Sequence, residues 1–133
     1  MALVLRCARF GMRVLIVDDD PVHLELMQRR LQKRGYDVDV MDGPIGATHR
    51  IRSTRPEVVL MDINLPGIPG DVLIGHARSR IGPETRIFYH SAMDEQHLRE
   101  LATRDGISGW FSKSTPIDEL AETLGQPRGC GTA

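Results

Sequence analysis

The chain has 133 residues, of which 41% are hydrophobic and 26% are charged, and its formal net charge at pH 7 is -1. This length suits one domain with a single core and is short for two. The composition indicates a globular protein, and the near-neutral charge argues against direct binding of nucleic acid.

Residues 1–11 form a predicted N-terminal extension that carries no chemistry of its own. The apolar run at residues 2–5 is interrupted by Arg6 and Arg9, so it is too short for the core of a signal peptide or for a membrane span. We therefore expect a cytoplasmic protein that does not bind membranes.

Short apolar runs alternate with segments of helical periodicity over residues 12–124, which we interpret as one domain. The alternation predicts an α/β fold, with βα units around a parallel sheet. Residues 14–17 and 58–61 are apolar throughout, as expected of central strands that helices cover on both faces. Residues 37–40 alternate polar and apolar side chains, which indicates a strand nearer an edge. The five predicted strands span residues 13–17, 37–41, 57–61, 86–89 and 109–112.

Residue types that favour helix ends fit this spacing. Asp20 is a predicted N-cap with Pro21 in the first turn, and the second helix is expected to start at the Gly-Pro pair of residues 43–44. Gly35 and Gly106 are expected where the first and fourth helices end.

A short last helix is predicted from Pro116 to Leu124, and the Gly-Gln-Pro sequence that follows is expected to end it. Residues 125–133 have the glycine-rich composition of a flexible C-terminal tail. Cys7 and Cys130 belong to no CxxC pattern and to no cluster with histidine, so we interpret both as free thiols.

Polar side chains follow the apolar runs at the expected carboxyl ends of the strands, where ligands bind in open α/β sheets. They are Asp18, Asp19, Asp62, Ser91 and Lys113. Three carboxylates held together repel one another unless a cation joins them, and a hard divalent ion such as Mg²⁺ fits such a cluster. Lys113 then suits a phosphate oxygen, and Ser91 can donate a hydroxyl hydrogen bond. The set predicts an acceptor site for phosphoryl transfer.

Four segments at these positions resemble the motifs of response-regulator receiver domains: Val-Leu-Ile-Val-Asp-Asp-Asp-Pro, Met-Asp-Ile-Asn-Leu-Pro-Gly, His-Ser-Ala and Gly-Trp-Phe-Ser-Lys. The likeness runs from Met12 to about Leu124. It implies a flavodoxin-like, doubly wound sheet of five parallel strands in the order 2-1-3-4-5, with helices on both faces.

The resemblance also implies the roles of the acidic residues. Asp62 would be the phosphorylated nucleophile, Asp19 and Asp62 would bind Mg²⁺ directly, and Asp18 would act through water. The backbone carbonyl of Asn64 would complete the protein ligands.

The remaining implied roles concern switching. Ser91 would be the switch hydroxyl, Lys113 the phosphate contact and Trp110 the aromatic residue that changes rotamer. The implied function is a phosphorelay module that receives its phosphoryl group from a histidine kinase or a histidine phosphotransfer protein. It would act on a downstream protein effector, with a phosphorylation-dependent dimer as a further partner, and would catalyse only its own phosphorylation and dephosphorylation.

Two residues depart from the family pattern. Ser114 follows Lys113 where most members have a proline in a cis peptide, and Pro69 replaces the acidic residue common before Gly70. We expect the Lys113-Ser114 peptide to be trans, because a cis bond without proline costs about 2.5–4 kcal/mol.

In the family, the side chains two residues after the acceptor and two after the switch hydroxyl border the approach of water; here they are Asn64 and Met93. Asn64 can orient a water molecule, whereas the thioether of Met93 cannot. We therefore expect slow hydrolysis of the phosphorylated state.

Each of these residues also has a plainer interpretation. Asp18 and Asp19 can form a solvated turn, Ser91 and Asp94 compete to cap the fourth helix, and Trp110 can be a core residue of an edge strand. The five histidines show no ligand spacing, and we interpret them as surface or packing residues: His23, His49, His76, His90 and His97.

Three other functions remain as alternatives. A pseudo-receiver that serves only as a scaffold is disfavoured by the complete set of acceptor residues. A phosphohydrolase of the haloacid-dehalogenase type would carry its nucleophile after the first strand and would contain a cap insertion. A flavodoxin-like FMN carrier would need a glycine-rich phosphate loop where this chain has three aspartates.

Overall fold

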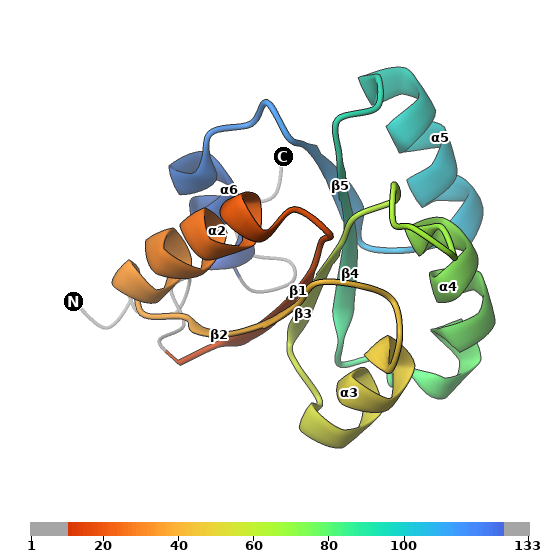
Figure 1. Cartoon of the computed structure of the whole chain (residues 1–133), viewed down its shortest axis with the longest axis horizontal. Coiled ribbons are helices and arrows are strands. Elements are labelled where there is room, and N and C mark those ends of the chain that lie inside the picture. Colours follow the sequence, from red (N-terminus) through yellow and green to blue (C-terminus); the bar gives the residue numbers. More distant parts are fainter. Residues whose placement is uncertain (1–10, 127–133) are drawn as a thin grey trace.

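The computed structural model describes residues 11–126, so the predictions for both cysteines and for the ends of the chain beyond this range lie outside the described residues. Five parallel strands form one sheet in the order β2-β1-β3-β4-β5, which is the predicted order (Figure 1). The strands are β1 (Arg13–Val17), β2 (Asp37–Met41), β3 (Val58–Met61), β4 (Arg86–Ser91) and β5 (Gly109–Ser112).

Helices cover both faces of the sheet, as predicted (Figure 1). One face packs against α2 and α6 through residues such as Leu24 and Leu120. The other packs against α3, α4 and α5 through Ile51, Ile74 and Leu98. The helices are α2 (Pro21–Lys33), α3 (Ala47–Thr54), α4 (Gly70–Ala77), α5 (Glu95–Asp105) and α6 (Ile117–Leu124), and a short 3-10 helix, η1 (Arg78–Arg80), follows α4.

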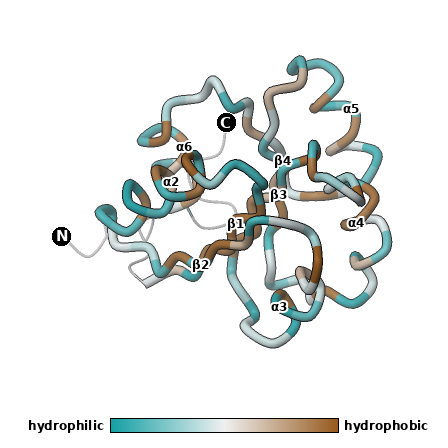
Figure 2. The backbone as a smooth tube through the Cα atoms, in the orientation of Figure 1, coloured by the Kyte–Doolittle hydropathy of each residue, from teal (hydrophilic) through white to brown (hydrophobic). Residues whose placement is uncertain are grey.

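The apolar runs form the inner strands of the sheet. Every residue of β3 is buried, and so is every residue of β1 after Arg13. Figure 2 shows hydrophobic colours along this centre, while the helices alternate between hydrophobic and hydrophilic segments. β2, with its alternating pattern, lies at an edge of the sheet, so both predictions about strand position are confirmed.

Two strand boundaries differ slightly from the prediction. β3 begins at Val58 rather than at residue 57, and β4 continues to Ser91 rather than ending at Tyr89. The longer β4 results from pairing with β5, because Ser91 lies opposite Ser112 and its carbonyl accepts a hydrogen bond from the Lys113 N–H. Ser91 is therefore the last residue of its strand.

Most helix ends follow their capping residues. Asp20 accepts hydrogen bonds from the backbone N–H groups of Val22 and His23, and Pro21 is the first residue of α2. Gly35, with a φ of 93°, follows the end of α2, and Gly106 caps the end of α5. At the start of α5, Asp94 accepts from the His97 N–H, which leaves Ser91 without a capping role.

The predicted start of the second helix was wrong. α3 begins at Ala47 instead of at the Gly-Pro pair of residues 43–44. Pro44 opens a turn in which its carbonyl accepts a hydrogen bond from the Ala47 N–H. Gly46 has a φ of 82° within that turn, and because this left-handed conformation interrupts a right-handed helix, α3 can start only after it.

Within residues 11–126, no helix combines the length and the apolar character needed to cross a bilayer.

Candidate functional site

The predicted acceptor residues meet at the carboxyl ends of the inner strands. Asp18 follows β1 and Asp62 follows β3, and backbone hydrogen bonds hold both: the Asp18 N–H donates to Met41, and the Asp62 N–H donates to Val17. The two side chains are only 1% and 3% exposed. Two carboxylates this deeply buried need a compensating cation.

Lys113 supplies a positive charge to both carboxylates. Its Nζ lies 2.8 Å from Asp18 Oδ2 and donates a hydrogen bond of 3.0 Å to Asp62 Oδ2. Burial by itself would lower the pKa of Lys113, but the hydrogen bonds to the two carboxylates outweigh it and raise that pKa. Lys113 is therefore a charged ammonium group in contact with both buried carboxylates.

The two buried carboxyl groups respond differently to this surrounding. Burial raises the pKa of Asp62 above its usual value, and the hydrogen bond from Lys113 offsets only part of that effect. Burial acts on Asp18 in the same direction, but hydrogen bonds from Lys113 and from the Asp20 N–H prevail and lower its pKa. Asp62 is thus the carboxylate with the less stabilised charge.

The acidic cluster carries the charge that a divalent cation would neutralise. Asp18, Asp19 and Asp62 can each present an oxygen within 4.8 Å of the others, and Asp19 is exposed to solvent. With Lys113 as the ammonium group between the two buried carboxylates, two negative charges remain. Oxygen ligands with one exposed side open to water fit Mg²⁺, which keeps several of its waters.

Asn64 and Ser91 link the loop after β3 to the end of β4. The Asn64 N–H donates to Asp62 Oδ1 at 3.1 Å, and its side-chain amide donates to Ser91 Oγ at 3.3 Å. Ser91 Oγ also accepts a hydrogen bond from the Met93 N–H. These contacts link Asp62 through Asn64 to the predicted switch hydroxyl of Ser91, and Ser91 in turn to the Met93 backbone. The metal-ligand role of the Asn64 carbonyl stays a prediction.

The loop between β3 and α4 packs closely against the acceptor. A Cβ atom on Gly70 would lie 1.9 Å from the backbone carbonyl oxygen of Asp62, so only glycine fits there. The Gly70 N–H donates to the Ile63 carbonyl, and Pro69 is the N-cap of α4. Pro69, the residue that departs from the family pattern, thus ends the loop without touching the acidic cluster through any hydrogen bond of the described residues.

Serine side chains shape the turn after β5 that carries Lys113. Among the described residues no peptide bond is cis, so the prediction of a trans Lys113-Ser114 peptide is confirmed. The Ser114 N–H donates to Ser112 Oγ, and the two hydroxyl groups lie 2.8 Å apart. Hydrogen bonds between these serines therefore stabilise the turn where most of the family has a proline.

Trp110 lies on β5, at the edge of the sheet, and is half-buried against the core on the α4 and α5 side. Its strand partner is Tyr89, and the guanidinium of Arg99 lies 5.6 Å from its ring centroid. The structure thus agrees with a core residue of an edge strand, and the switching role of Trp110 stays a prediction.

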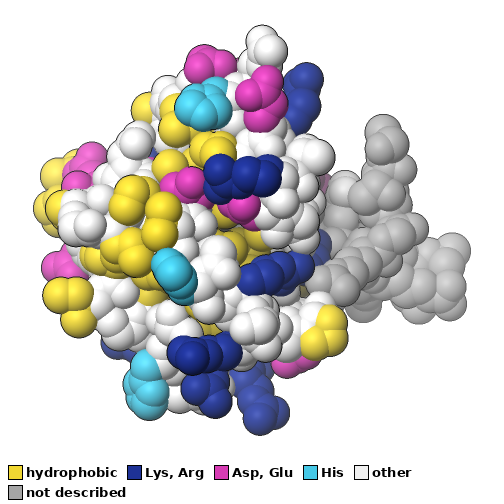
Figure 3. Space-filling view, turned by 90° about the vertical axis from the view of Figure 1, so that its right-hand side faces the viewer, with side chains coloured by type: hydrophobic (Ala, Val, Ile, Leu, Met, Phe, Trp, Pro, Cys, Tyr) yellow, Lys and Arg dark blue, Asp and Glu magenta, His cyan; other side chains and the backbone are white. Residues whose placement is uncertain are grey.

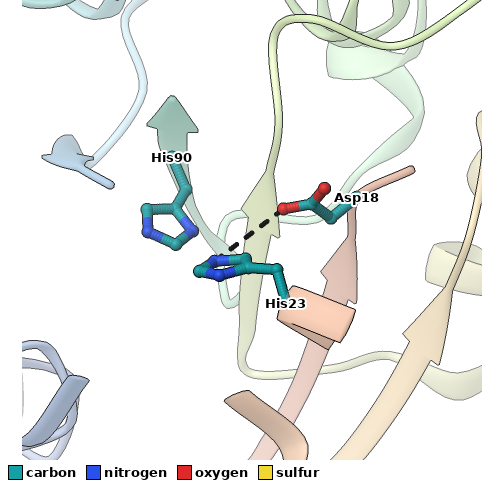
Figure 4. Close-up of side chains that lie close together, drawn as sticks. All are labelled: Asp18, His23 and His90. Atoms are coloured by element: carbon teal, nitrogen blue, oxygen red, sulfur yellow. Dashed lines mark ion pairs between the residues drawn. The ribbon is translucent and has the colours of Figure 1, made fainter. Parts of the chain in front are cut away.

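Two histidines that we interpreted from the sequence as surface or packing residues lie beside Asp18 (Figure 4). His23 extends from the first turn of α2 and His90 from β4, and their ring centroids are 5.2 Å apart. His90 is 3% exposed, and burial, with smaller effects of His23 and Lys113, lowers its pKa to about 4. Residues 23 and 90 lie far apart in the chain, so a search for ligand spacing could not find the pair. The available signal was β-strand alternation, which puts His90 on the opposite face of the sheet from Ser91.

Comparison with known proteins gives one consistent result. The model of the response regulator receiver domain family matches residues 14–125. The response regulator MprA of Mycobacterium avium (strain 104) is 29% identical over 109 residues, which cover 82% of this chain and 47% of that protein. MprA of Mycobacterium bovis (strain BCG / Pasteur 1173P2) is 28% identical over 110 residues, with coverage of 83% and 47%. The chain thus spans about half the length of these relatives.

Solved structures show the same likeness. The BeF3-activated N-terminal receiver domain of Klebsiella pneumoniae RstA superposes with a TM-score of 0.77 at 29% identity, covering 84% of this chain and 94% of that one. The receiver domain of the putative response regulator NarL from Mycobacterium tuberculosis gives a TM-score of 0.75 at 26% identity, with coverage of 87% and 94%.

Proposed function

This chain belongs to the family of response regulator receiver domains, and on that premise we propose that it accepts a phosphoryl group on Asp62 in a Mg²⁺-dependent reaction. The donor is a phosphohistidine of a histidine kinase or of a histidine phosphotransfer protein. The phosphorylated domain then acts on a downstream protein effector, with no direct contact to nucleic acid or to membranes. We place this exchange in the cytoplasm.

The observation that carries the proposal is the position of Lys113 between the two buried carboxylates. Its Nζ lies within 3.0 Å of Asp62 Oδ2, while Asp62 Oδ1 accepts a hydrogen bond from the Asn64 N–H. One oxygen of Asp62 therefore accepts a hydrogen bond from the backbone, and the other contacts the ammonium group of Lys113, which would turn to a phosphoryl oxygen in the reaction. A site of this kind catalyses phosphoryl transfer by positioning and charge neutralisation.

The reaction forms one bond and breaks one. An oxygen of Asp62 attacks the phosphorus, the phosphorus–nitrogen bond of the phosphohistidine breaks, and the departing imidazole keeps the electron pair and takes up a proton. Lys113 exchanges its contact with Asp62 for one with a phosphoryl oxygen.

The residues that would hold Mg²⁺ are Asp19 and Asp62 directly, Asp18 through water, and the Asn64 backbone carbonyl. When bound, the ion would neutralise the charge that develops on the phosphoryl oxygens.

Switching would begin at Ser91. Its hydroxyl oxygen now accepts hydrogen bonds from Asn64 and Met93, and it would turn to donate its proton to the new phosphoryl group. Trp110 would change rotamer in response and alter the partner-binding surface on the side of α4 and α5. Figure 3 views this side of the molecule, where hydrophobic side chains gather beside acidic and basic ones.

The test is incubation of the chain with Mg²⁺ and acetyl phosphate, followed by measurement of intact mass. Wild-type protein should gain one phosphoryl group, and Asp62→Asn should gain none. Modification of Asp62→Asn at the wild-type rate would refute Asp62 as the acceptor. An unmodified wild-type chain that still binds partner proteins would favour the scaffold function instead.

A further inference from the structure

Two histidine rings, those of His23 and His90, lie beside the carboxylate of Asp18, which also belongs to the acidic cluster. His23 extends from the start of α2, and His90 extends from the end of β4 (Figure 4). His90 extends to the face of the sheet that carries Phe88 and packs against α2 and α6. The two rings therefore meet under the first turn of α2, next to the buried carboxylate of Asp18.

Neither ring has a hydrogen-bond partner that explains its position. His23 Nε2 is buried and makes no hydrogen bond to any described residue, and it lies 3.9 Å from Asp18 Oδ2, which is too far for one. His90 is 3% exposed, and within the described part of the chain its side chain makes no hydrogen bond. A buried polar atom without a partner, such as His23 Nε2, is rare in folded proteins and calls for a cause.

The three side chains form the donor set of a transition-metal site. One ligand atom from each of Asp18, His23 and His90 can lie within 4.8 Å of the others. A tetrahedral ion bound at 2.0–2.1 Å needs its ligands about 3.4 Å apart, a spacing that small side-chain rotations would produce. Three protein ligands from two imidazoles and one carboxylate leave a fourth position for water.

We propose that Asp18, His23 and His90 bind a divalent transition metal ion, with Zn²⁺ as the best fit. Imidazole nitrogens favour Zn²⁺, Ni²⁺ and Cu²⁺, whereas Mg²⁺ prefers oxygen ligands. Asp18 with the two histidines therefore favours a transition metal ion, whereas Asp18 with Asp19 and Asp62 favours Mg²⁺. Zn²⁺ is the choice here because it accepts tetrahedral sites with mixed nitrogen and oxygen ligands.

Occupation of the two sides is mutually exclusive at Asp18. The oxygen that lies 3.9 Å from His23 Nε2 is the same Oδ2 that lies 2.8 Å from Lys113 Nζ. An ion bound at the histidines would repel the ammonium group of Lys113 and occupy the carboxylate. Zn²⁺ should therefore inhibit phosphorylation, a consequence that rests on the proposed function, whereas the binding itself does not.

The binding test is titration of the full chain with Zn²⁺ in a calorimeter, with Cys7→Ser and Cys130→Ser introduced to remove thiol ligands. His23→Leu and His90→Leu should each weaken Zn²⁺ binding by at least about tenfold, since partners that merely orient a ligand are already worth roughly 10–100-fold. His97→Gln, which removes an exposed histidine of α5, is the matched control and should bind like the parent.

Two further measurements complete the test. Co²⁺ in place of Zn²⁺ should give the visible absorption of a tetrahedral site in the parent protein and lose it in His23→Leu, whose partly exposed position makes folding of that variant secure. Unchanged Zn²⁺ affinity in both histidine variants overturns the proposal. Equal losses in Asp19→Asn and in the histidine variants would also overturn it, because the ion would then occupy the acidic cluster.

Inhibition is measured separately, as acetyl phosphate labelling with and without Zn²⁺ at constant Mg²⁺. Zn²⁺ should suppress labelling of the parent and not of His90→Leu. If the parent protein takes up no phosphate even without Zn²⁺, the proposed function is wrong. The calorimetric titration tests the metal site independently of that result.

Discussion

The two sides of Asp18 differ in how completely the fold satisfies their polar groups. Towards Asp62, the ammonium of Lys113 contacts both buried carboxylates at 2.8 and 3.0 Å. Towards His90, the nearest imidazole nitrogen is 3.9 Å from the carboxylate, and no hydrogen bond of the described residues holds it. One side is a set of charges that stabilise one another, and the other is a pair of imidazole rings without hydrogen bonds among the described residues. Removal of the shared ammonium group should therefore destabilise the fold, whereas removal of a histidine ring should change its stability little.

The largest effect should come from Lys113→Met, which removes the charge shared by Asp18 and Asp62. Loss of one partner leaves buried carboxylates uncompensated, which costs about 3–5 kcal/mol for fully buried pairs. Because the Lys113 side chain is 22% exposed, we expect a decrease in the free energy of unfolding of about 2–3 kcal/mol at pH 7. Urea unfolding measures it, and labelling by acetyl phosphate should be lost in parallel. A variant as stable as the wild type would show that the ion pairs contribute nothing net.

The next largest effect should be that of Met93→Glu on the lifetime of the phosphorylated state. Met93 lies beside Ser91 and offers no group that orients water. Met93→Glu adds a carboxylate there and should shorten the half-life, and a tenfold change corresponds to about 1.4 kcal/mol of barrier. Loss of phosphate after removal of the donor, at matched Mg²⁺, is the measurement, with Mg²⁺ affinity checked in both proteins. Equal or slower decay in the variant would remove Met93 from the path of the water.

A smaller effect on stability should come from Asp62→Asn, and it should depend on pH. The folded state raises the pKa of Asp62, so the ionised form is less favourable in the folded chain than in the unfolded chain. The penalty is absent below the ordinary pKa of 3.8 and grows as pH rises through the raised folded value. The variant lacks this penalty, so its stability relative to wild type should increase from acid pH towards pH 7.

Urea unfolding of Asp62→Asn and wild type at pH 7 and near pH 3.5 would show this trend as a difference that shrinks in acid. A difference that grows towards acid would mean that the Asp62 pKa is lowered, and the assignment of the poorly stabilised charge to Asp62 would be wrong.

The smallest effect should come from the histidine side. His90→Leu replaces a buried ring that makes no hydrogen bond among the described residues with an apolar side chain of similar size. Such a replacement is close to neutral, and we expect a gain of about 0.5 kcal/mol in the absence of transition metals. A loss of more than about 2 kcal/mol, typical of a cavity, would show that the ring packs the core and would erase the contrast with Lys113.

Much of the fold was predictable because its signals are local. The apolar runs at residues 14–17 and 58–61 required cover on both faces, and the alternation at residues 37–40 required an edge. The errors occurred where a boundary depends on a partner or on one backbone torsion angle. β4 reaches Ser91 because β5 lies beside it, and α3 starts late because Gly46 has a positive φ.

The acceptor site was predictable for a related reason. In a parallel sheet the carboxyl ends of all strands share one edge, so polar residues that follow apolar runs must gather there. Asp18, Asp62, Ser91 and Lys113 all follow this rule, and the structure brings them together. The rule predicts which residues gather but not the distances between them, so only the folded structure shows that Lys113 lies between the two carboxylates.

The sequence by itself determined the class of fold and the residues of the acceptor site, because hydrophobic periodicity and the position of polar residues after strands act over a few neighbours. Tertiary structure alone decided which groups surround Asp18 on its other side. His23 is on α2 and His90 is on β4, far apart in the sequence, and their 5.2 Å approach depends on how α2 packs on the sheet. A contact of that kind is set by packing between layers, for which no local pattern exists.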